Sequence, residues 1–573
     1  MKKSIIIYSL IITGCGVVMA QDPFTAFNIS QSDLKGTARY MGMAGAFGAL
    51  GGDLTAISQN PGGIGVYRSS DIGFTLDLDA QSSSSQNEGM KYDMSQTKFY
   101  LNNIGAVFTL KLPSNICPNL NFGFTYNKGA SFNRIYGGNI GTLRNSMSNY
   151  IAGIAQSLDL TQGDVSYDND NDPYNPAPGY IPAPWLTVLG YDSFLINPEY
   201  IESTKRTNWY GLWDSNGSMT GQNTAGSGSF LIQESGGLNE FNIVIGGNVN
   251  DILYWGMNFD IINLNYNLST IWGENLTNAI VPGEKSFVRG NADWNLNSLY
   301  TLSGTGFNYQ LGFIVKPIQP IRLGFAFHTP TWYSLNEEFS ALTNYNIGVE
   351  SGSWITNDGI PGYNSYNFRT PWRIIASAAG VIGSKLIVSF DYEWANYGSM
   401  KFSETKYYDG YYDYDWDYPW DYPWWYNTTE AYTQFPNIND PYNVENSAIS
   451  SYYKSSNTFR VGIEFKPISA LSIRAGYSNV SSPVRKEIRD NQLIAITNGL
   501  TPSYRLDNST NYITCGLGFR YSHFYADLAY VYKHMESEYH AYSSDPENPK
   551  MPSPQSKISL NNNQVVLSLG YRF

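Results

Sequence analysis

The sequence is poor in charge and lacks any long apolar run after its N-terminal segment. Only 14% of the 573 residues are charged, whereas 15% are aromatic, with 46 Tyr and 54 Gly. This composition argues against a soluble helical enzyme and favours a β-rich chain with many turns and interfacial aromatic rings. A membrane-spanning helix needs about 20 consecutive apolar residues, and no stretch beyond Val18 approaches that length. If the chain enters a membrane, it must do so as a closed β-barrel, because only helices and barrels satisfy every backbone group in lipid.

Cysteine, histidine and basic residues are scarce as well. Beyond the N-terminal segment the only cysteines are Cys117 and Cys515, and the sequence leaves open whether they form a disulfide or stay free. The four His accompany no recognisable nucleophile motif and are too dispersed for a haem site. We therefore expect no enzymatic activity, no cofactor and no metal. The net charge of −13 argues against nucleic acid as a partner, because phosphate binding needs a basic surface.

The N-terminus has the features of an export signal. Lys2 and Lys3 precede an apolar stretch from Ile5 to Val18, and small or apolar residues follow up to Ala20. This pattern predicts a signal peptide over residues 1–20, with cleavage before Gln21.

Fourteen amphipathic segments follow from Asp71 onward, recognised by period-two alternation and by the Gly, Pro and Asn residues between them. Together they predict an all-β fold, a 14-stranded antiparallel transmembrane barrel. The segments begin near Ile72, Tyr100, Leu120, Phe241, Leu253, Phe307, Ile321, Trp372, Lys385, Thr458, Leu471, Asn511, Phe524 and Gln564.

Charged residues share one parity within these segments, opposite an apolar parity. Placing a charge on the lipid face of a barrel costs roughly 2 to 4 kcal/mol, so the charged parity should face the lumen and form networks across strands. The residues concerned are Asp391, Glu393, Arg460, Glu464, Arg474 and Asp527.

The last strand is amphipathic and ends on an aromatic residue. Val565, Leu567 and Leu569 share its apolar face, and the chain stops at Phe573. A terminal Phe in this setting resembles the signal that barrel assembly machinery reads in outer-membrane proteins, so we expect Phe573 to contact that machinery.

The connections between the segments are of two kinds. Short ones occur near residues 113–119, 249–251, 316–319, 383–384, 466–469 and 522–523. The others are expected to be long loops, over about 81–98, 135–239, 267–306, 331–370, 396–455, 479–509 and 534–562. Short turns at one end and long loops at the other are typical of an outer-membrane barrel, whose short turns are periplasmic.

Two of the long loops have unusual composition. Asp168, Asp170 and Asp172 are spaced as at the start of a calcium loop, but Pro173 and Gly179 break the EF-hand pattern, so a solvated acidic turn is the alternative. Residues 407–426 alternate aromatic rings with carboxylates, which could stack on sugars or apolar ligands, or could pack against neighbouring loops.

The segment before the first strand carries a recognisable pattern. Residues 36–50 are rich in Gly, Ala and Met, and they lead through Asp53 to Asn60-Pro61-Gly62. This order and spacing resemble the N-terminal hatch of the FadL/TodX family of outer-membrane transporters for hydrophobic compounds. Ala44 stands where a Gly is common in the family, and Gly62 replaces the usual Ala.

The resemblance implies a domain organisation and a localisation. Residues 21–66 would form a hatch that plugs the lumen, and residues 67–573 would form the barrel with long extracellular loops, in the outer membrane of a Gram-negative bacterium. Within the hatch, Asn60, Pro61 and Gly62 would shape a gate. Pro61 fixes one φ, and we expect the two glycines after it to adopt conformations that other residues avoid.

The apolar residues of the hatch have two interpretations. Met41, Met43 and Phe47 could line a ligand pocket, because Met adapts to flexible ligands, or they could simply seal the barrel.

By resemblance, the expected function is passive uptake of a hydrophobic or amphipathic small molecule such as a long-chain fatty acid. The family captures its ligand at the outer loops, passes it to a pocket above the hatch and releases it sideways into the membrane. Expected partners are therefore the hydrophobic ligand, outer-membrane lipid and the barrel assembly machinery. The alternative is a FadL-like barrel that acts as a protein-binding adaptor or shuttle of a secretion system.

Overall fold

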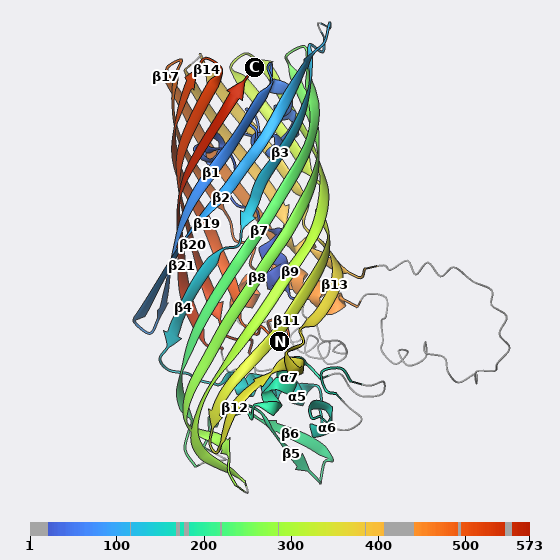
Figure 1. Cartoon of the computed structure of the whole chain (residues 1–573), viewed down its shortest axis with the longest axis vertical. Coiled ribbons are helices and arrows are strands. Elements are labelled where there is room, and N and C mark those ends of the chain that lie inside the picture. The colour runs from blue at the N-terminus through green and yellow to red at the C-terminus, as the bar shows by residue number, and fades with distance from the viewer. Residues whose placement is uncertain are drawn as a thin grey trace, which may run out of the picture.

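The computed structural model shows a closed antiparallel barrel of 14 strands (Figure 1). Strand β21 pairs with β1 from Asp71–Arg572 to Gln86–Lys557, which closes the wall and removes its edges. The structure describes residues 21–114, 116–167, 172–176, 183–217, 221–284, 286–383, 385–405, 441–490, 494–544 and 553–573. The expected fold class is confirmed. The signal peptide, Asp168–Asp170 and the aromatic loop 407–426 lie outside the described residues.

Several wall strands are interrupted and then continued by a second segment. The wall consists, in order, of β1 (Asp71–Asn87), β2 (Met90–Lys111), β3 (Asn119–Ser131) with β4 (Arg134–Ile140), β7 (Ala225–Val249), β8 (Leu253–Pro282), β9 (Phe287–Ile318), β10 (Ile321–His328) with β11 (Trp332–Ile347), β14 (Arg373–Ile382) with β13 (Gly362–Arg369), β15 (Leu386–Asn396) with β16 (Lys401–Ser403), β17 (Ser455–Ile468), β18 (Leu471–Val480), β19 (Tyr504–Tyr521), β20 (Phe524–His540) and β21 (Gln555–Arg572).

The remaining elements lie before the wall or between its strands. They are α2 (Pro23–Ser30), α3 (Ala38–Met41), α4 (Ala56–Gln59), η1 (Pro61–Val66), α5 (Met147–Ser157), α6 (Gln162–Val165), α7 (Trp185–Asp192), β5 (Asn197–Ile201), β6 (Arg206–Tyr210), β12 (Glu350–Ile355), η2 (Thr356–Gly359), η3 (Tyr397–Ser399), α8 (Asn443–Tyr452) and α9 (Lys486–Arg489). None of the described helices is long and apolar enough to cross a membrane.

The short connections are confirmed, but several expected loops are wrong. Residues 81–98 form a continuous hairpin of β1 and β2, which turns at Glu88 and Gly89 with positive φ at both. Most of 267–306 belongs to β8 and β9, and most of 331–370 belongs to β11, β12 and β13. The strands thus run well beyond the length that a bilayer requires, which is about 9–11 residues.

The strand halves next to the short turns have an apolar outer face, which we call the belt half. In β8 the side chain of Met257 is 51% exposed on the outside, whereas Asn258 and Asp260 are buried inside. On the last strand Val565, Leu567 and Leu569 are exposed, and so is Phe573, which ends the chain. An apolar exterior around a polar interior is the surface of a transmembrane barrel.

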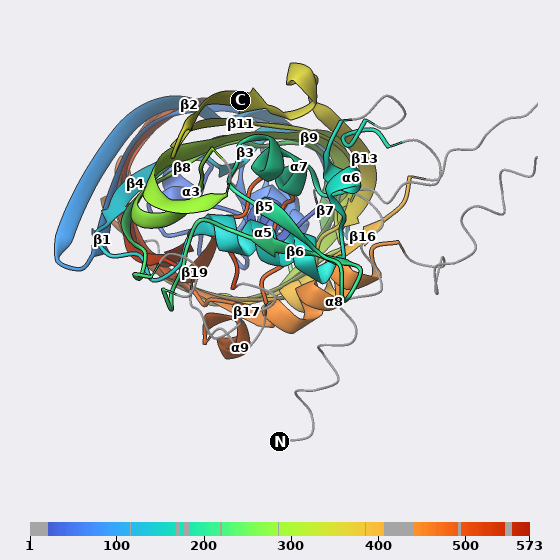
Figure 2. The ribbon, with the colours of Figure 1, turned by 90° about the horizontal axis from the view of Figure 1, so that it is seen from below.

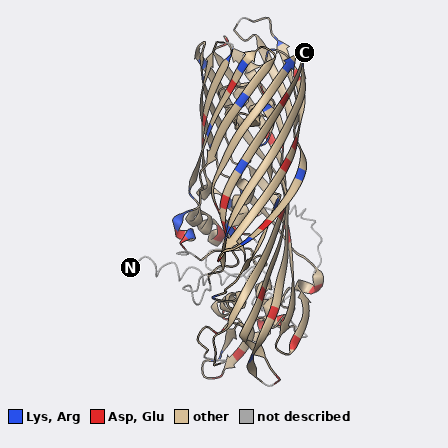
Figure 3. Ribbon diagram, turned by 90° about the vertical axis from the view of Figure 1, so that its left-hand side faces the viewer, with Lys and Arg blue, Asp and Glu red and all other residues tan. Residues whose placement is uncertain are grey.

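Five of the six expected lumen charges form networks across strands. Asp391 also faces inward, but it binds the hatch, accepting from the N–H of Gly48 at 2.9 Å and from Gln59 at 3.1 Å. Arg460 pairs with Glu393 at 2.6 Å, and Arg474 bridges Glu464 and Asp527 at 2.6 Å each. Each pair joins different strands, as the lumen prediction required. Lys and Arg gather toward the end of the barrel that carries the C-terminus, while the other end carries mostly Asp and Glu (Figure 3).

Beyond the belt the two faces of the wall exchange their character, in a region that we call the outer half. From Ile262 onward most inward residues of β8 are apolar, among them Leu264 and Tyr266, while Asn263 and Asn265 face outward. The outer half is therefore built like a water-soluble β-protein, with an apolar interior and a polar exterior.

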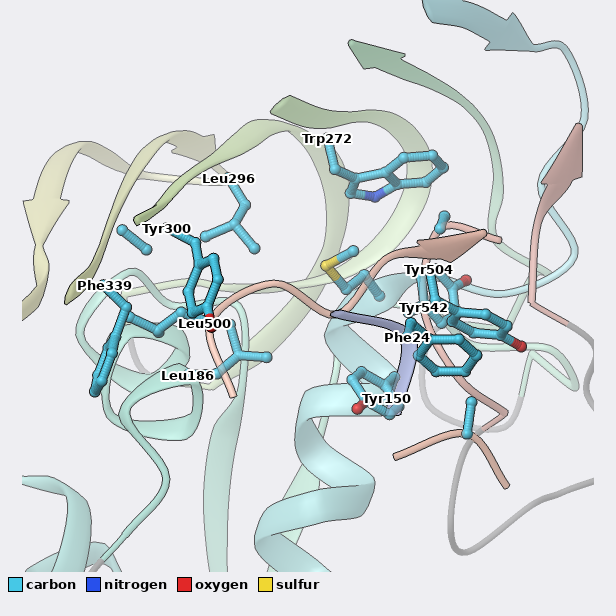
Figure 4. Close-up of a cluster of buried hydrophobic side chains, with 14 of the residues drawn as sticks. Phe24, Tyr150, Leu186, Trp272, Leu296, Tyr300, Phe339, Leu500, Tyr504 and Tyr542 are labelled. Carbon is cyan, nitrogen blue, oxygen red and sulfur yellow. The ribbon is translucent and has the colours of Figure 1, made fainter. Parts of the chain in front are cut away.

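The apolar interior of the outer half is filled by segments inserted between strands. Helices α5, α6 and α7 and the β5–β6 ribbon lie across the mouth of the barrel (Figure 2). In Figure 4 aromatic residues of these helices and of the wall meet Phe24 of α2. Phe24 stacks on Tyr504 with ring centroids 4.6 Å apart, and Trp185 packs edge-on against Phe339 at 5.2 Å.

Two buried carboxyls of the outer half have no basic partner within 4.0 Å in the described part of the chain. Burial raises the pKa of Glu337 to about 7, and Glu337 accepts hydrogen bonds from Gln21 at 2.7 Å and Tyr300 at 2.9 Å. Burial likewise raises the pKa of Glu274 to about 7. Both groups therefore prefer to keep their protons in the folded protein.

Both described cysteines are free. Cys117 lies in the β2–β3 turn, and Cys515 is exposed on the outer face of β19.

Candidate functional site

The N-terminal segment, residues 21–66, lies inside the barrel, and its helices begin at local caps. Asp22 accepts hydrogen bonds from the backbone N–H groups of Phe24 and Thr25 at 2.8 Å and starts α2, with Pro23 at the first helical position. Asn60 accepts from the N–H of Gly62 at 3.0 Å and starts η1. We call this segment the hatch from here on.

The hatch meets the wall through glycines on both sides. A Cβ atom added to Gly62 would lie 2.9 Å from the carbonyl oxygen of Gly312 on β9, and one added to Gly256 on β8 would lie 2.1 Å from the carbonyl oxygen of Pro61. Gly42 likewise faces Gly516 on β19, and a Cβ on Gly324 of β10 would meet the carbonyl of Gly48. Backbone therefore packs on backbone around much of the belt half, and side chains at these positions would push the hatch away from the wall.

The reason for glycine at position 62 differs from the one expected. Neither Gly62 nor Gly63 has a positive φ, and both lie in the 3₁₀ helix η1. Close approach, and not an unusual backbone conformation, requires Gly62. Asn60 fixes the same contact, because its Nδ2 donates to the carbonyls of Gly48 at 2.5 Å and Phe313 at 3.2 Å.

The apolar hatch residues are fully enclosed. Met41, Met43 and Phe47 are 0% exposed and belong to one cluster that also contains Leu34 and Tyr40. The cavities described below are lined by Tyr40 but not by these three residues. Their ligand-binding role stays a prediction, and in this structure they occupy the position of a seal.

Charged groups anchor the hatch to the wall at several points. Lys35 pairs with Asp77 at 2.6 Å and with Asp79 at 3.1 Å, both on β1. Asp33 pairs with Lys533 of β20 at 3.1 Å, and Arg39 pairs with Glu464 of β17 at 3.1 Å. Removing one partner of such a buried pair typically costs about 3 to 5 kcal/mol, so the hatch is firmly held.

The wall itself is interrupted between β2 and β3. Their backbone ladder runs from Lys111–Asn119 to Asn103–Asn127 and ends there, although both strands continue toward the outer half. Beyond this point the wall bends: β3 has a register shift at Gly129, and its partner β7 has positive φ at Gly236 and Gly237. We call the interval between the two strands the side gap.

Side chains span the side gap where the backbone ladder has ended. Tyr100 of β2 lies 3.0 Å from the Ser131 hydroxyl, and its own hydroxyl accepts a hydrogen bond from Asn133 at 2.7 Å. The ammonium groups of Lys35 and Lys128 lie 5.0 and 5.8 Å from the centre of the Tyr100 ring. Because side chains change rotamer far more readily than a ladder breaks, the wall opens more easily at Tyr100 than where the β2–β3 ladder is intact.

A cavity lies on each side of this part of the wall. Inside, a polar cavity of about 130 Å³, the lumen cavity, is bordered by the hatch and by residues of β3, β7 and β8 that include Asn127, Glu240 and Asp260. Outside, an apolar groove of about 940 Å³ is lined on the same strands by the neighbouring outward residues Tyr126, Phe241 and Ile261 among others. The two cavities thus lie on opposite faces of the wall, next to the end of the side gap at which the β2–β3 ladder stops.

Sequence reasoning did not find the side gap. The signals were the Gly236-Gly237 pair and Gly129 within otherwise regular strands, since glycine inside a strand often marks a bulge or bend. The gate role of Asn60, Pro61 and Gly62 and the assembly role of Phe573 stay predictions. Among the described residues no cluster of three or more possible metal ligands occurs.

Comparison with known proteins gives structural similarities only. No protein-family model and no curated protein matches the sequence. Among solved structures, the chain is similar to a FadL homologue of Pseudomonas aeruginosa at 12% identity, covering 95% of this chain and 99% of that chain, with a TM-score of 0.49. It is also similar to the toluene transporter TodX of Pseudomonas putida at 11% identity, covering 95% of this chain and 100% of that chain, with a TM-score of 0.46. The toluene transporter TbuX of Ralstonia pickettii is similar at 13% identity, covering 96% of this chain and 100% of that chain, with a TM-score of 0.39.

Proposed function

We propose that this barrel is a passive outer-membrane transporter for hydrophobic or amphipathic small molecules such as long-chain fatty acids, in a Gram-negative bacterium. In this proposal residues 1–20 are removed on export, residues 21–66 are the hatch and residues 67–573 are the barrel. The apolar belt of the wall supports insertion in a membrane. The similarity to transporters of hydrophobic compounds agrees with the proposal.

One observation carries the proposal: the lumen cavity and the apolar outer groove flank the end of the β2–β3 ladder at Asn103 and Asn127. A molecule with an apolar part gains free energy by moving from water into the groove, at roughly 25 cal/mol per Å² of apolar surface buried. In this proposal, displacement of Tyr100 opens a route from the lumen to the lipid. No energy source is needed, because the gradient and later consumption of the ligand set the direction.

The hatch has a closing role in this proposal. Asn60, Pro61 and Gly62 hold the hatch against β8 and β9, while Met41, Met43 and Phe47 seal the lumen toward the periplasmic turns. The tight glycine contacts favour an exit through the side of the barrel over one through its floor. Opening at Asn60–Gly62 remains the competing prediction.

Uptake of a labelled long-chain fatty acid tests the proposal directly. The cells carry this barrel as their only such transporter, and surface expression is checked for each variant. We expect uptake above that of empty-vector cells. With Cys117 and Cys515 replaced by Ser, joining Tyr100→Cys to Ser131→Cys with a short dithiol-reactive linker should lower uptake toward the empty-vector level, because the linker bars the side gap.

The controls separate blockage from damage. Each single-cysteine variant treated with the linker should retain uptake, and so should the double variant without it. Equal uptake by wild-type and empty-vector cells would exclude transport of this ligand class and would favour the secretion-adaptor alternative, which a pull-down of secreted proteins then tests.

A further inference from the structure

The lumen cavity is lined by both acidic and basic side chains, which come from the hatch and from several wall strands; the basic ones are Lys35, Lys128, Arg373 and Arg460. Glu240 on β7 and Asp260 on β8 line the cavity beside Lys128 of β3, whose ammonium group donates to Asn239 at 3.2 Å. They are diagonal neighbours on adjacent strands, because Asp260 pairs with Asn242, two residues from Glu240. In the described part of the chain neither carboxylate has a Lys or Arg partner within 4.0 Å. Asp260 is 1% exposed, its Oδ2 accepts from Asn308 at 3.2 Å, and its Oδ1 has no hydrogen-bond partner.

Two guanidinium groups, from β14 and β17, also line the cavity. Arg373 of β14 donates to the carbonyl oxygen of Ser30 at 2.8 Å and to the hydroxyl of Ser32 at 3.0 Å, and no carboxylate of the described residues lies within 4.0 Å of it. Arg460 pairs through Nη2 with Glu393, while its Nη1 is buried without a partner. Both arginines therefore retain hydrogen-bonding capacity toward the cavity.

Uncharged groups of the cavity lining also lack partners. The hydroxyl of Ser30 and the Oε1 atom of Gln59 are buried without a hydrogen bond, in residues that are 1% and 7% exposed. Buried polar groups of native proteins are nearly always satisfied, by protein, ordered water or ligand. A volume of about 130 Å³ holds roughly four water molecules or one small headgroup.

Unpaired buried charges are costly, and a cavity that presents both signs is neutralised best by an occupant that carries both. A fatty acid satisfies only basic groups and adds a carboxylate to a cavity that already holds Glu240 and Asp260. A pure hydrocarbon satisfies neither side.

We propose that the lumen cavity binds a zwitterionic headgroup, with its ammonium group against Glu240 and Asp260 and its anionic group against Arg373 and Arg460. The apolar chain of the ligand then passes the side gap and lies in the outer groove. This inference rests on the proposed transport function and narrows its substrate class from hydrophobic compounds in general to zwitterionic amphiphiles. The headgroup could belong to a single-chain amphiphile from outside the cell or to a two-chain lipid of the membrane.

A series of ligands with one common C12 chain tests the headgroup. Dodecyl betaine, dodecanoate and dodecyltrimethylammonium are titrated into the full-length barrel in dodecyl maltoside, and single adducts are counted by native mass spectrometry. We expect dodecyl betaine to bind about tenfold more tightly than either singly charged ligand, the factor that one extra charge-assisted contact provides.

Charge variants assign each half of the headgroup. Glu240→Gln/Asp260→Asn should weaken betaine about tenfold and bring dodecanoate to equal or higher affinity, because the repulsion is removed. Arg373→Gln should weaken betaine and dodecanoate but not dodecyltrimethylammonium. Glu338→Gln and Arg289→Gln, on exposed outward positions of β11 and β9, are the matched controls and should change nothing.

The outcomes separate this inference from the transport proposal. Dodecanoate binding as tightly as betaine, or variants that change all three ligands equally, would overturn the zwitterion assignment and leave transport intact. Absence of any saturable C12 binding would count against both. Protein extracted directly from its membrane identifies the source of the ligand: a two-chain zwitterionic adduct points to the membrane, and a single-chain one to the exterior.

Discussion

The belt half and the outer half of the barrel are built from the same strands, but the interior of the belt half is polar and that of the outer half is apolar. Along β8 the side chains alternate between the two faces from Met257 to Leu264. The apolar residue Met257 faces outward, whereas the apolar residue Leu264 faces inward. The change occurs at Ile261 and Ile262, which face opposite sides of the wall. Lipid surrounds one half and water the other, so the same period-two pattern specifies opposite cores. The period-two pattern therefore shows that a strand has an apolar and a polar face. Whether the apolar face points outward or inward depends on whether lipid or water surrounds the strand.

The largest effect is expected in the interior of the outer half. Trp272→Ala removes an indole that is 3% exposed and packs near Tyr542, and loss of such a core aromatic typically costs about 3 to 5 kcal/mol. Hydrogen exchange should show faster exchange in α5 and in the outer part of β8, with the belt half unchanged. Ser269→Ala, on the outward parity of the same strand, is the control; uniform exchange changes in both halves would contradict a separate outer core.

A charge placed on the outer surface should distinguish the two halves on one strand. Met257→Arg puts a guanidinium into the belt and should cost about 2 to 4 kcal/mol, whereas Asn263→Arg faces water and should stay within about 0.5 kcal/mol. Urea unfolding in lipid vesicles measures both. Similar losses for the two variants would mean that the belt ends elsewhere.

The outer half should lose stability as the pH rises. The pKa of Glu337 is about 7 in the folded protein against an ordinary value of 4.5, so the folded state holds the proton more tightly. Stability therefore falls between about pH 4.5 and 7, by at most about 3 kcal/mol, and levels off above that range. Glu337→Gln should reduce the dependence of the tryptophan-detected Tm on pH and leave the part that Glu274 contributes, and an unchanged slope would exclude Glu337 as a source.

A smaller effect is expected where the hatch touches the wall. Gly62→Val directs its Cβ at the β9 backbone and should strain the contact by about 1 to 3 kcal/mol, loosening the hatch while the barrel assembles. Planar-bilayer conductance should rise. Gly380→Val is the matched control, because nothing lies within 4 Å of a Cβ there. Equal conductance of the two variants would show that Gly62 does not hold the hatch.

The belt half was the part of the fold that the sequence could predict. Its strands expose apolar residues and bury charges such as Arg474 and Asp527, and this is the pattern that lipid imposes. The outer half was assigned to a loop over 267–306 because its polar outward residues, such as Asn267 and Asn275, look like loop composition when the inward core is not considered.

The sequence indicated where the hatch lies but not how it packs against the wall. The run from Gly36 to Gly63 indicated a segment inside the lumen, but the glycines that receive it, such as Gly312 and Gly516, are scattered over distant strands. Their role depends on which backbones meet across the lumen, which no linear pattern records. The side gap was missed for the same reason, since it depends on where the ladder between β2 and β3 ends.

The central claim is that ligand leaves sideways past β2 and β3 while the hatch stays seated. A Cβ on Gly42 of the hatch lies 3.6 Å from that of Ala529 on β20, within the range of a disulfide of about 3.5 to 4.5 Å. Gly42→Cys/Ala529→Cys, with Cys117 and Cys515 replaced by Ser, therefore locks the hatch to the wall when oxidised. We predict equal fatty-acid uptake by the oxidised and the reduced protein; uptake that is lost on oxidation and restored on reduction would contradict lateral exit and show that the hatch must move.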